Sequence, residues 1–201
     1  RLCREHGVLL IVDEIAMGFG RTGRMFAFEH AGIDPDIVCV GKALSAGYLP
    51  ISAAIVKDAI HGTFSDKPTD HTFYHGHTFC GNPVAAAAAL EALSIYEEED
   101  IPAKAVAMET LFKHSLAPLS NLPFVQDVRC LGAIAAVELK PESPVPAVTR
   151  PHRVRMALLA EGILLRPLGN VVYLMPPLNI GKADLEWLAG KLAEAITASA
   201  G

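Results

Sequence analysis

Short apolar runs, separated by glycine-rich and polar segments, dominate the first part of the chain. Residues 8–12 and 37–40 are continuously apolar and rich in β-branched side chains, which is typical of strands buried on both faces of a parallel sheet. A third apolar run covers residues 51–56. Together the three runs predict part of an α/β sheet.

Helical signals follow a polar segment. Residues 57–81 are polar and rich in histidine and glycine, which predicts a loop after a short helix. Asn82 and Pro83 suit the N-cap and the first position of a helix, and alanine and leucine continue from there through Tyr96. The sequence therefore predicts a helix that begins at Asn82 and ends in the acidic run 97–100.

The pattern changes near residue 99, and the remainder predicts a smaller α+β domain. Gly132 is expected to turn one strand back onto the next. Apolar residues at helical spacing form one stripe of the last helix: Leu185, Leu188, Leu192 and Ile196. The expected elements are helices over 102–117, 154–161 and 182–197, and strands within 124–139, 162–169 and 171–178. We accordingly predict two domains, 1–98 and 99–201.

Composition narrows the class of protein. Hydrophobic residues make up 51% of the 201 residues, yet no segment reaches the roughly 18 uninterrupted apolar residues of a membrane helix. The net charge is −5 without a basic cluster, so nothing indicates binding to nucleic acid. Four scattered cysteines without a C-x-x-C pair favour a reducing, cytoplasmic location. Because the chain begins at Arg1, within what reads as the end of a helix, we expect a piece of a longer protein.

The segment VLLIVDEIAMGFGRTG contains the spacing Gly18-x-Gly20-x-x-Gly23 of a dinucleotide-binding loop. In such a loop the first glycine directly follows the strand, and a helix follows the last glycine. Here five residues separate the strand from Gly18, and the segment after Gly23 is too short for a crossover helix. An NAD-binding domain is therefore only a remote alternative.

Asp13 and Lys42 each follow an apolar run, 29 positions apart. The carboxyl ends of parallel strands form the edge at which open α/β sheets bind ligands. Pyridoxal phosphate requires a carboxylate, which keeps its pyridine nitrogen protonated, and an amine, which forms a Schiff base and moves the proton. The sequence thus indicates a pyridoxal phosphate site, and the alternative is that Asp13 only caps a neighbouring loop.

Two segments of the chain are VDEIAMGFGRTGRMFAFEHAGIDPDIVCVGKALSAGYLPISAAIV and YHGHTFCGNPVAAAAALEAL. Both resemble the class III aminotransferases, which are pyridoxal phosphate enzymes of fold type I. A third segment, LLRPLGNVVYLMPPL, resembles the members of this family that act in biotin synthesis, where they convert 8-amino-7-oxononanoate to 7,8-diaminononanoate. The resemblance implies an α/β fold, with the C-terminal part of a large mixed-sheet domain followed by a small α+β domain. It also implies a homodimer.

The resemblance assigns roles to particular residues. Asp13 would contact the pyridine nitrogen, and Lys42 would hold the cofactor as an aldimine. The Thr78 hydroxyl and the His77 backbone would bind the phosphate of the cofactor in the other subunit, next to a helix start that favours an anion. Without the resemblance, Thr78 would be a loop residue with local turn contacts.

Substrate contacts follow from the same resemblance. Gly76 would line the substrate pocket, and Arg166 would pair with the substrate carboxylate in a bidentate contact. The amine donor would be S-adenosylmethionine or lysine. Class III aminotransferases that act on ornithine, 4-aminobutyrate, β-alanine or diamines are the alternative.

The chain departs from the family in three respects. Met17 stands where the family usually has threonine, and His77 stands where some members have proline. The N-terminal half of the family, with its phosphate loop and the aromatic residue over the cofactor ring, has no counterpart here. We therefore expect the isolated chain to be inactive or poorly soluble, with an exposed apolar sheet edge.

Two further interpretations stay open. His71, His75 and His77, with carboxylates from 97–100, could indicate a metal-dependent hydrolase. Two of these histidines flank a glycine in a loop, however, so solvated histidines and no metal are favoured. The other interpretation is a relic chain without activity that folds only with a partner supplying the missing half.

Overall fold

The computed structural model describes residues 1–65, 71–142 and 149–200. The chain divides into two compact units. The first consists of Arg1–Gly20 and Arg24–Ile101, and the second of Arg21–Gly23 and Pro102–Gly201. No helix of the described residues combines the length and the apolar character needed to cross a membrane.

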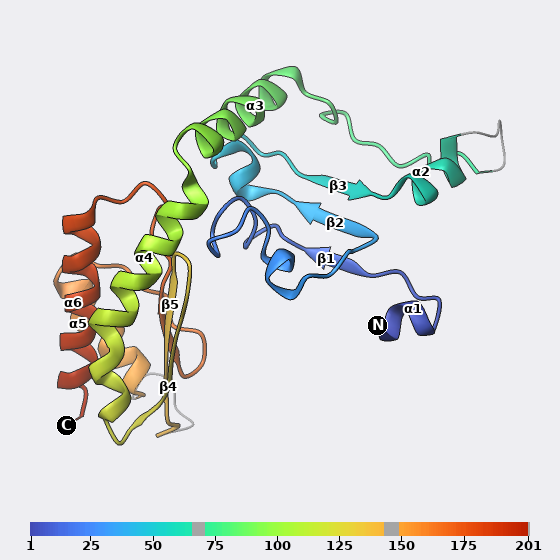
Figure 1. Cartoon of the computed structure of the whole chain (residues 1–201). Coiled ribbons are helices and arrows are strands. Elements are labelled where there is room, and N and C mark those ends of the chain that lie inside the picture. The colour runs from blue at the N-terminus through green and yellow to red at the C-terminus, as the bar shows by residue number, and fades with distance from the viewer. Residues whose placement is uncertain (66–70, 143–148, 201) are drawn as a thin grey trace. The chain divides into compact units, whose positions relative to one another are not determined.

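A mixed three-stranded sheet forms the centre of the first unit (Figure 1). Strand β2 (Ile37–Val40) lies in the middle, parallel to β1 (Ile11–Asp13) and antiparallel to β3 (Ala53–Val56). The prediction of a strand over 37–40 is confirmed. The helical elements of this unit are α1 (Leu2–Glu5), η1 (Ala27–Ala31), η2 (Lys42–Ser45), α2 (Asp58–Ser65) and α3 (Pro83–Glu98).

The prediction that residues 8–12 are buried on both faces is wrong. The strand is shorter, and Val8, Leu9 and Ile11 are 58%, 55% and 59% exposed. β1 lies at the edge of the described sheet, with β2 as its one hydrogen-bonded neighbour there. An apolar run therefore marks the strand but not the layers that cover it.

The short helix predicted at the start of the polar segment before α3 is confirmed. Helix α2 occupies the first part of this segment, and residues 66–70 lie outside the described residues. The predicted start of α3 is confirmed, because the Asn82 Oδ1 accepts hydrogen bonds from the backbone N–H groups of Val84 (2.9 Å) and Ala85 (3.1 Å) and Pro83 occupies the first turn.

The second unit contains an antiparallel sheet in the order β4-β5-β6. The strands are β4 (Val125–Leu131), β5 (Ile134–Leu139) and β6 (Val171–Leu174), and the helices are α4 (Ile101–Leu116), η3 (Ala117–Asn121), α5 (Arg150–Ala160) and α6 (Lys182–Ala198). Alternate residues of β5 are buried in the core of this unit, and so is most of the apolar stripe of α6. The predicted helices over 102–117 and 182–197 and the strand pair that turns at Gly132 are confirmed.

Two predictions in this unit need correction. Helix α5 begins at Arg150, earlier than the apolar pattern indicated, and part of the loop expected before it lies outside the described residues. Residues 162–169 do not form a strand, and within them only Leu168 makes an isolated bridge, to Val171. Gly162 has a φ of +81° and Pro167 has no N–H, so an extended ladder cannot form there.

The last glycine of the pattern, Gly23, serves packing in the second unit. The Ala133 N–H donates to the Arg21 carbonyl (2.9 Å), and the Arg21 Nη1 donates to the Pro176 carbonyl (2.6 Å). A Cβ on Gly23 would lie 2.9 Å from the Val106 Cγ2. After this segment comes the five-residue 3-10 helix η1, so the crossover helix of a dinucleotide fold does not follow.

Candidate active site

Asp13 and Lys42 follow the carboxyl ends of neighbouring parallel strands. Asp13 is the last residue of β1 and lies opposite Cys39 of β2, and Lys42 begins η2 two residues after β2 ends. Both residues are exposed in this chain. The structure therefore places both at the same edge of the sheet, where the sequence predicted them.

Both side chains keep polar atoms available. The Asp13 Oδ1 accepts a hydrogen bond from the Ile15 N–H (2.9 Å), while no contact within the described part of the chain engages Oδ2. The Lys42 amine has no hydrogen bond or ion pair with residues 1–65, 71–142 or 149–200. A carboxylate and an amine in this state can bind a ligand without first breaking strong protein contacts.

The backbone of Lys42 is in the left-handed region, with a φ of +42°. For a residue with a side chain this conformation is unfavourable, and it persists only where surrounding contacts fix it. One such contact is the Tyr96 hydroxyl of α3, which donates to the Ala43 carbonyl. Another is the buried Ser45, whose hydroxyl donates to the Leu49 carbonyl (2.5 Å). From the sequence, Tyr96 was predicted only as a helix residue. Its hydrogen bond to Ala43 joins positions 53 apart, so no local pattern indicated it.

Glu14, next to Asp13, is 1% exposed. Its two carboxylate oxygens accept hydrogen bonds from the backbone N–H groups of Ala27 (3.0 Å) and Phe28 (2.8 Å), at the start of η1. The Gly18 N–H in turn donates to the Glu14 carbonyl (2.9 Å). Glu14 thus anchors the turn that follows Asp13 and is not itself available to a ligand.

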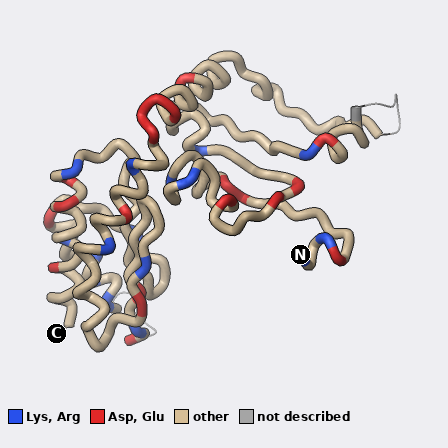
Figure 2. Tube along the Cα trace, viewed as in Figure 1, with Lys and Arg blue, Asp and Glu red and all other residues tan. Residues whose placement is uncertain are grey.

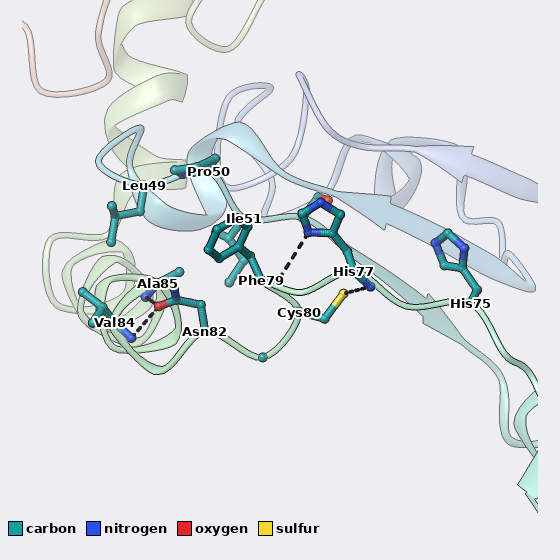
Figure 3. Close-up of a pocket in the computed structure, with 12 residues that line it drawn as sticks. Leu49, Pro50, Ile51, His75, His77, Phe79, Cys80, Asn82, Val84 and Ala85 are labelled. Carbon is teal, nitrogen blue, oxygen red and sulfur yellow. Dashed lines mark hydrogen bonds between the residues drawn. The ribbon is translucent and has the colours of Figure 1, made fainter.

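Gly76, His77 and Thr78 lie in an exposed segment before α3. The His77 N–H donates to the Cys80 Sγ (3.3 Å), and the His77 Nδ1 accepts from the Phe79 N–H (3.2 Å), as Figure 3 shows. The Thr78 hydroxyl has no hydrogen bond to any described residue. Sulfur is a weak acceptor, so an anionic oxygen can replace it on the His77 N–H.

A cavity of about 930 Å³ lies beside this segment, between residues 49–52 and the first turn of α3 (Figure 3). Of the three residues above, His77 lines it and Gly76 and Thr78 do not. The expectation that free N–H groups at the helix start attract an anion needs correction. Asn82 already occupies two of these N–H groups, which leaves Thr78 and His77 as the candidate anion ligands.

Arg166 belongs to the second unit and is exposed. Its guanidinium makes no hydrogen bond or ion pair with the residues that the structure describes. It lines a cavity of about 620 Å³ together with residues from α5 and from the connection between α5 and β6. The cationic group is thus available to an anionic ligand.

Among residues 1–65, 71–142 and 149–200, no group of three or more His, Cys, Asp or Glu side chains could hold a metal ion. The described structure therefore does not support a metal-dependent hydrolase. His77 precedes α3, and the acidic run 97–100 begins within the last turn of this helix (Figure 2). A helix of 16 residues is about 24 Å long, so it keeps these groups apart.

Comparisons with known proteins agree on one family. The family profile Aminotransferase class-III matches residues 1–196. An adenosylmethionine-8-amino-7-oxononanoate aminotransferase of Nitratidesulfovibrio vulgaris is 42% identical over 209 residues, covering 98% of this chain and 38% of that protein. The crystal structure of the Methanocaldococcus jannaschii protein of the same name superposes with a TM-score of 0.89 at 37% identity, covering 99% of this chain and 48% of the other.

The ornithine aminotransferase of Toxoplasma gondii, with pyridoxal phosphate partially occupying its active site, superposes with a TM-score of 0.84 at 36% identity. The alignment covers 98% of this chain and 45% of that one. The chain therefore spans less than half the length of these relatives.

These superpositions extend over nearly the whole chain and establish an α/β fold of the fold type I pyridoxal-phosphate-dependent transferases, as the sequence predicted. Because the family profile covers all but the last few residues, the chain belongs to the class III aminotransferases, which depend on pyridoxal phosphate.

Proposed function

We propose that this chain forms the C-terminal part of an aminotransferase that converts 8-amino-7-oxononanoate to 7,8-diaminononanoate in biotin synthesis. The observation that carries transamination is the position of Asp13 and Lys42 at one edge of a parallel strand pair. The substrate rests on relatives such as the 42% identical protein of Nitratidesulfovibrio vulgaris and on the segment around Arg166. A location in the cytoplasm and a homodimer belong to the same proposal.

The residues at the sheet edge fit pyridoxal phosphate. With respect to the described residues, Asp13 has a free carboxylate oxygen for the protonated pyridine nitrogen, and Lys42 has an unpaired amine for covalent attachment. When bound, pyridoxal phosphate supplies an electron sink that stabilises the negative charge left on a substrate carbon after it loses a proton. Lys42 Nζ accepts that proton from the donor, and Asp13 holds the proton on the pyridine nitrogen.

Phosphate binding is assigned to the segment before α3. The Thr78 hydroxyl and the His77 N–H are the groups of that segment that an anion can engage. In the proposed homodimer they bind the phosphate held by the other subunit. The site is then complete only when two subunits meet.

The acceptor substrate is assigned to Gly76 and Arg166. Gly76 carries no side chain and leaves room in the substrate pocket, and no atom of a described residue lies within 4 Å of where its Cβ would be. Arg166 pairs with the carboxylate of the acceptor. S-adenosylmethionine or lysine supplies the amine in the first half-reaction, and the keto acid receives it in the second.

A second candidate is ornithine transamination. It is favoured by the 36% identity and the TM-score of 0.84 to the Toxoplasma gondii enzyme, which are close to the values for the biotin-pathway enzyme of Methanocaldococcus jannaschii. Ornithine also carries a carboxylate that Arg166 could bind. Turnover with each substrate separates the two candidates.

The test uses the full-length protein that contains this chain. We expect turnover of 8-amino-7-oxononanoate with S-adenosylmethionine or lysine and none with ornithine. Treatment with borohydride should leave a pyridoxyl group on the peptide that contains Lys42, detectable by mass spectrometry. Lys42→Ala should lose this label and nearly all turnover, while Lys182→Ala, an exposed lysine of α6, should keep both. A label on another lysine would overturn the assignment.

A further inference from the structure

We propose that Arg155 is a positioning residue for Arg166 and thereby sets the affinity for the carboxylate of the acceptor. The inference rests on the proposed function, because it takes Arg166 as the group that binds this carboxylate. Arg155 lies in the middle of α5, and nothing in the sequence pattern distinguished it.

The connection that contains Arg166 is fixed at both ends. At its start, the Ile163 N–H donates to the Leu158 carbonyl at the end of α5 (2.8 Å). At its other end, Leu168 and Val171 exchange two backbone hydrogen bonds of 2.9 and 3.0 Å. The residues between these contacts form no ladder with any strand that the structure describes.

Arg155 supplies the contact in the middle of this connection. Its Nε donates to the carbonyl of Leu165, the residue before Arg166 (3.3 Å). The Leu165 side chain is 8% exposed and belongs to the core of the unit. On the other side, Pro167 restricts Arg166 to extended backbone conformations. Arg155 therefore helps to fix the backbone from which the Arg166 side chain extends.

The two arginines also share one cavity. Arg155 and Arg166 line the cavity of about 620 Å³ with His152, and none of its lining residues, all in the described part of the chain, is acidic. Leu164, Leu165 and Pro167 give it an apolar wall. A carboxylate at the end of a methylene chain, as in 8-amino-7-oxononanoate, matches cationic groups beside an apolar wall.

The test measures steady-state kinetics of the full-length enzyme with both substrates varied. We expect Arg155→Ala to raise the KM for the keto acid about tenfold, as for one charge-assisted hydrogen bond, with kcat and the KM for the donor unchanged. Arg155→Lys should restore most of the affinity, because its amine can donate to the same carbonyl and keeps the charge. Arg155→Met keeps the aliphatic stem and replaces the alanine variant if that variant does not fold.

Two further variants make the result specific. Arg166→Ala should raise the same KM, and the double variant should be no worse than Arg166→Ala alone, because Arg155 acts through Arg166. Arg129→Ala, an exposed arginine of β4 in the same unit, is the matched control and should leave the KM unchanged.

The outcomes separate this inference from the proposed function. An unchanged KM in Arg166→Ala would overturn the carboxylate assignment itself. A raised KM in Arg166→Ala with Arg155→Ala equal to the control would overturn only the role of Arg155. Additive losses in the double variant, or an equal effect on the donor, would also overturn it.

Discussion

The Tyr96 hydroxyl donates to the carbonyl of Ala43, the residue that follows Lys42. Tyr96 is buried near the C-terminal end of α3, where its ring also packs against Phe19 with centroids 5.8 Å apart. Helix α3 therefore contacts the 3-10 turn that begins with Lys42 and holds its backbone at a positive φ. The position of the amine depends on a helix that begins 41 residues further along the chain.

Tyr96→Phe should loosen this turn. The substitution removes the hydrogen bond to the Ala43 carbonyl and leaves the ring, so we expect local opening of residues 42–46 to become easier by about 1 kcal/mol. Hydrogen exchange followed by mass spectrometry on the full-length protein measures this at the peptide that contains Lys42. Tyr48→Phe, at an exposed tyrosine of the same unit, is the control. Equal protection in both variants would show that Tyr96 does not hold the turn.

Glu14→Ala should destabilise the turn after Asp13. Without the carboxylate, the N–H groups of Ala27 and Phe28 lose their acceptor, at a cost of about 3 kcal/mol for the two. Faster exchange at residues 26–31 and a lower urea midpoint check this expectation. Glu91→Ala, at an exposed position of α3, should leave both values unchanged. If the two variants behave alike, the buried carboxylate does not anchor the turn.

Local sequence signals were sufficient for much of the fold. Continuous β-branched residues marked β2, Asn82 and Pro83 marked the start of α3, and Gly132 marked the turn between β4 and β5. Each of these signals depends on residues that are close in the sequence, so the element can be predicted without knowledge of tertiary contacts. The exposure of β1 was not predictable in this way, because burial depends on layers that the local pattern does not describe.

The candidate site was predictable to a similar extent. Asp13 and Lys42 stood out because strand ends place their residues at a known edge of the sheet. The positive φ of Lys42 and the contacts of Tyr96 and Arg155 were not predictable, because they depend on which elements pack together. The strand expected over 162–169 failed for a related reason, since apolar residues that enter a core need not pair with a strand.

The stability of the first unit should depend on pH through Asp36. The N–H of Leu10 donates to the Asp36 carboxylate (2.8 Å), and this bond, with the Lys57 amine, lowers the pKa of Asp36 below its usual 3.8. A pKa that is lower in the folded state stabilises the folded protein at pH values above the pKa of the unfolded state. This contribution is lost as the pH falls through the pKa of the folded state.

Asp36→Asn is the corresponding variant. Its urea midpoint should be below that of the unchanged protein near pH 7, and the difference should shrink as pH falls below about 4. Asp58→Asn, at an exposed residue at the start of α2, is the control and should show no such convergence. A difference that stays constant from neutral to acidic pH would contradict the role of Asp36.

Gly132→Ala should strongly destabilise the second unit. Gly132 has a φ of +54°, and a Cβ there would lie 2.4 Å from the carbonyl carbon of Thr22 and 2.5 Å from the Arg21 oxygen. That backbone cannot easily move aside, because Arg21 accepts from the Ala133 N–H and donates to the Pro176 carbonyl. We expect a loss of more than about 3 kcal/mol in the free energy of unfolding.

Gly169→Ala separates the two causes of that loss. Gly169 has nearly the same φ, +57°, but no atom in the described part of the chain lies within 4 Å of where its Cβ would be. It should lose only about 1 kcal/mol, the cost of a left-handed conformation. Urea denaturation of both variants, followed by far-ultraviolet circular dichroism, measures the difference. A much larger loss for Gly132→Ala would show that the clash with segment 21–23 causes most of the destabilisation. Equal losses would leave the positive φ as the only cause.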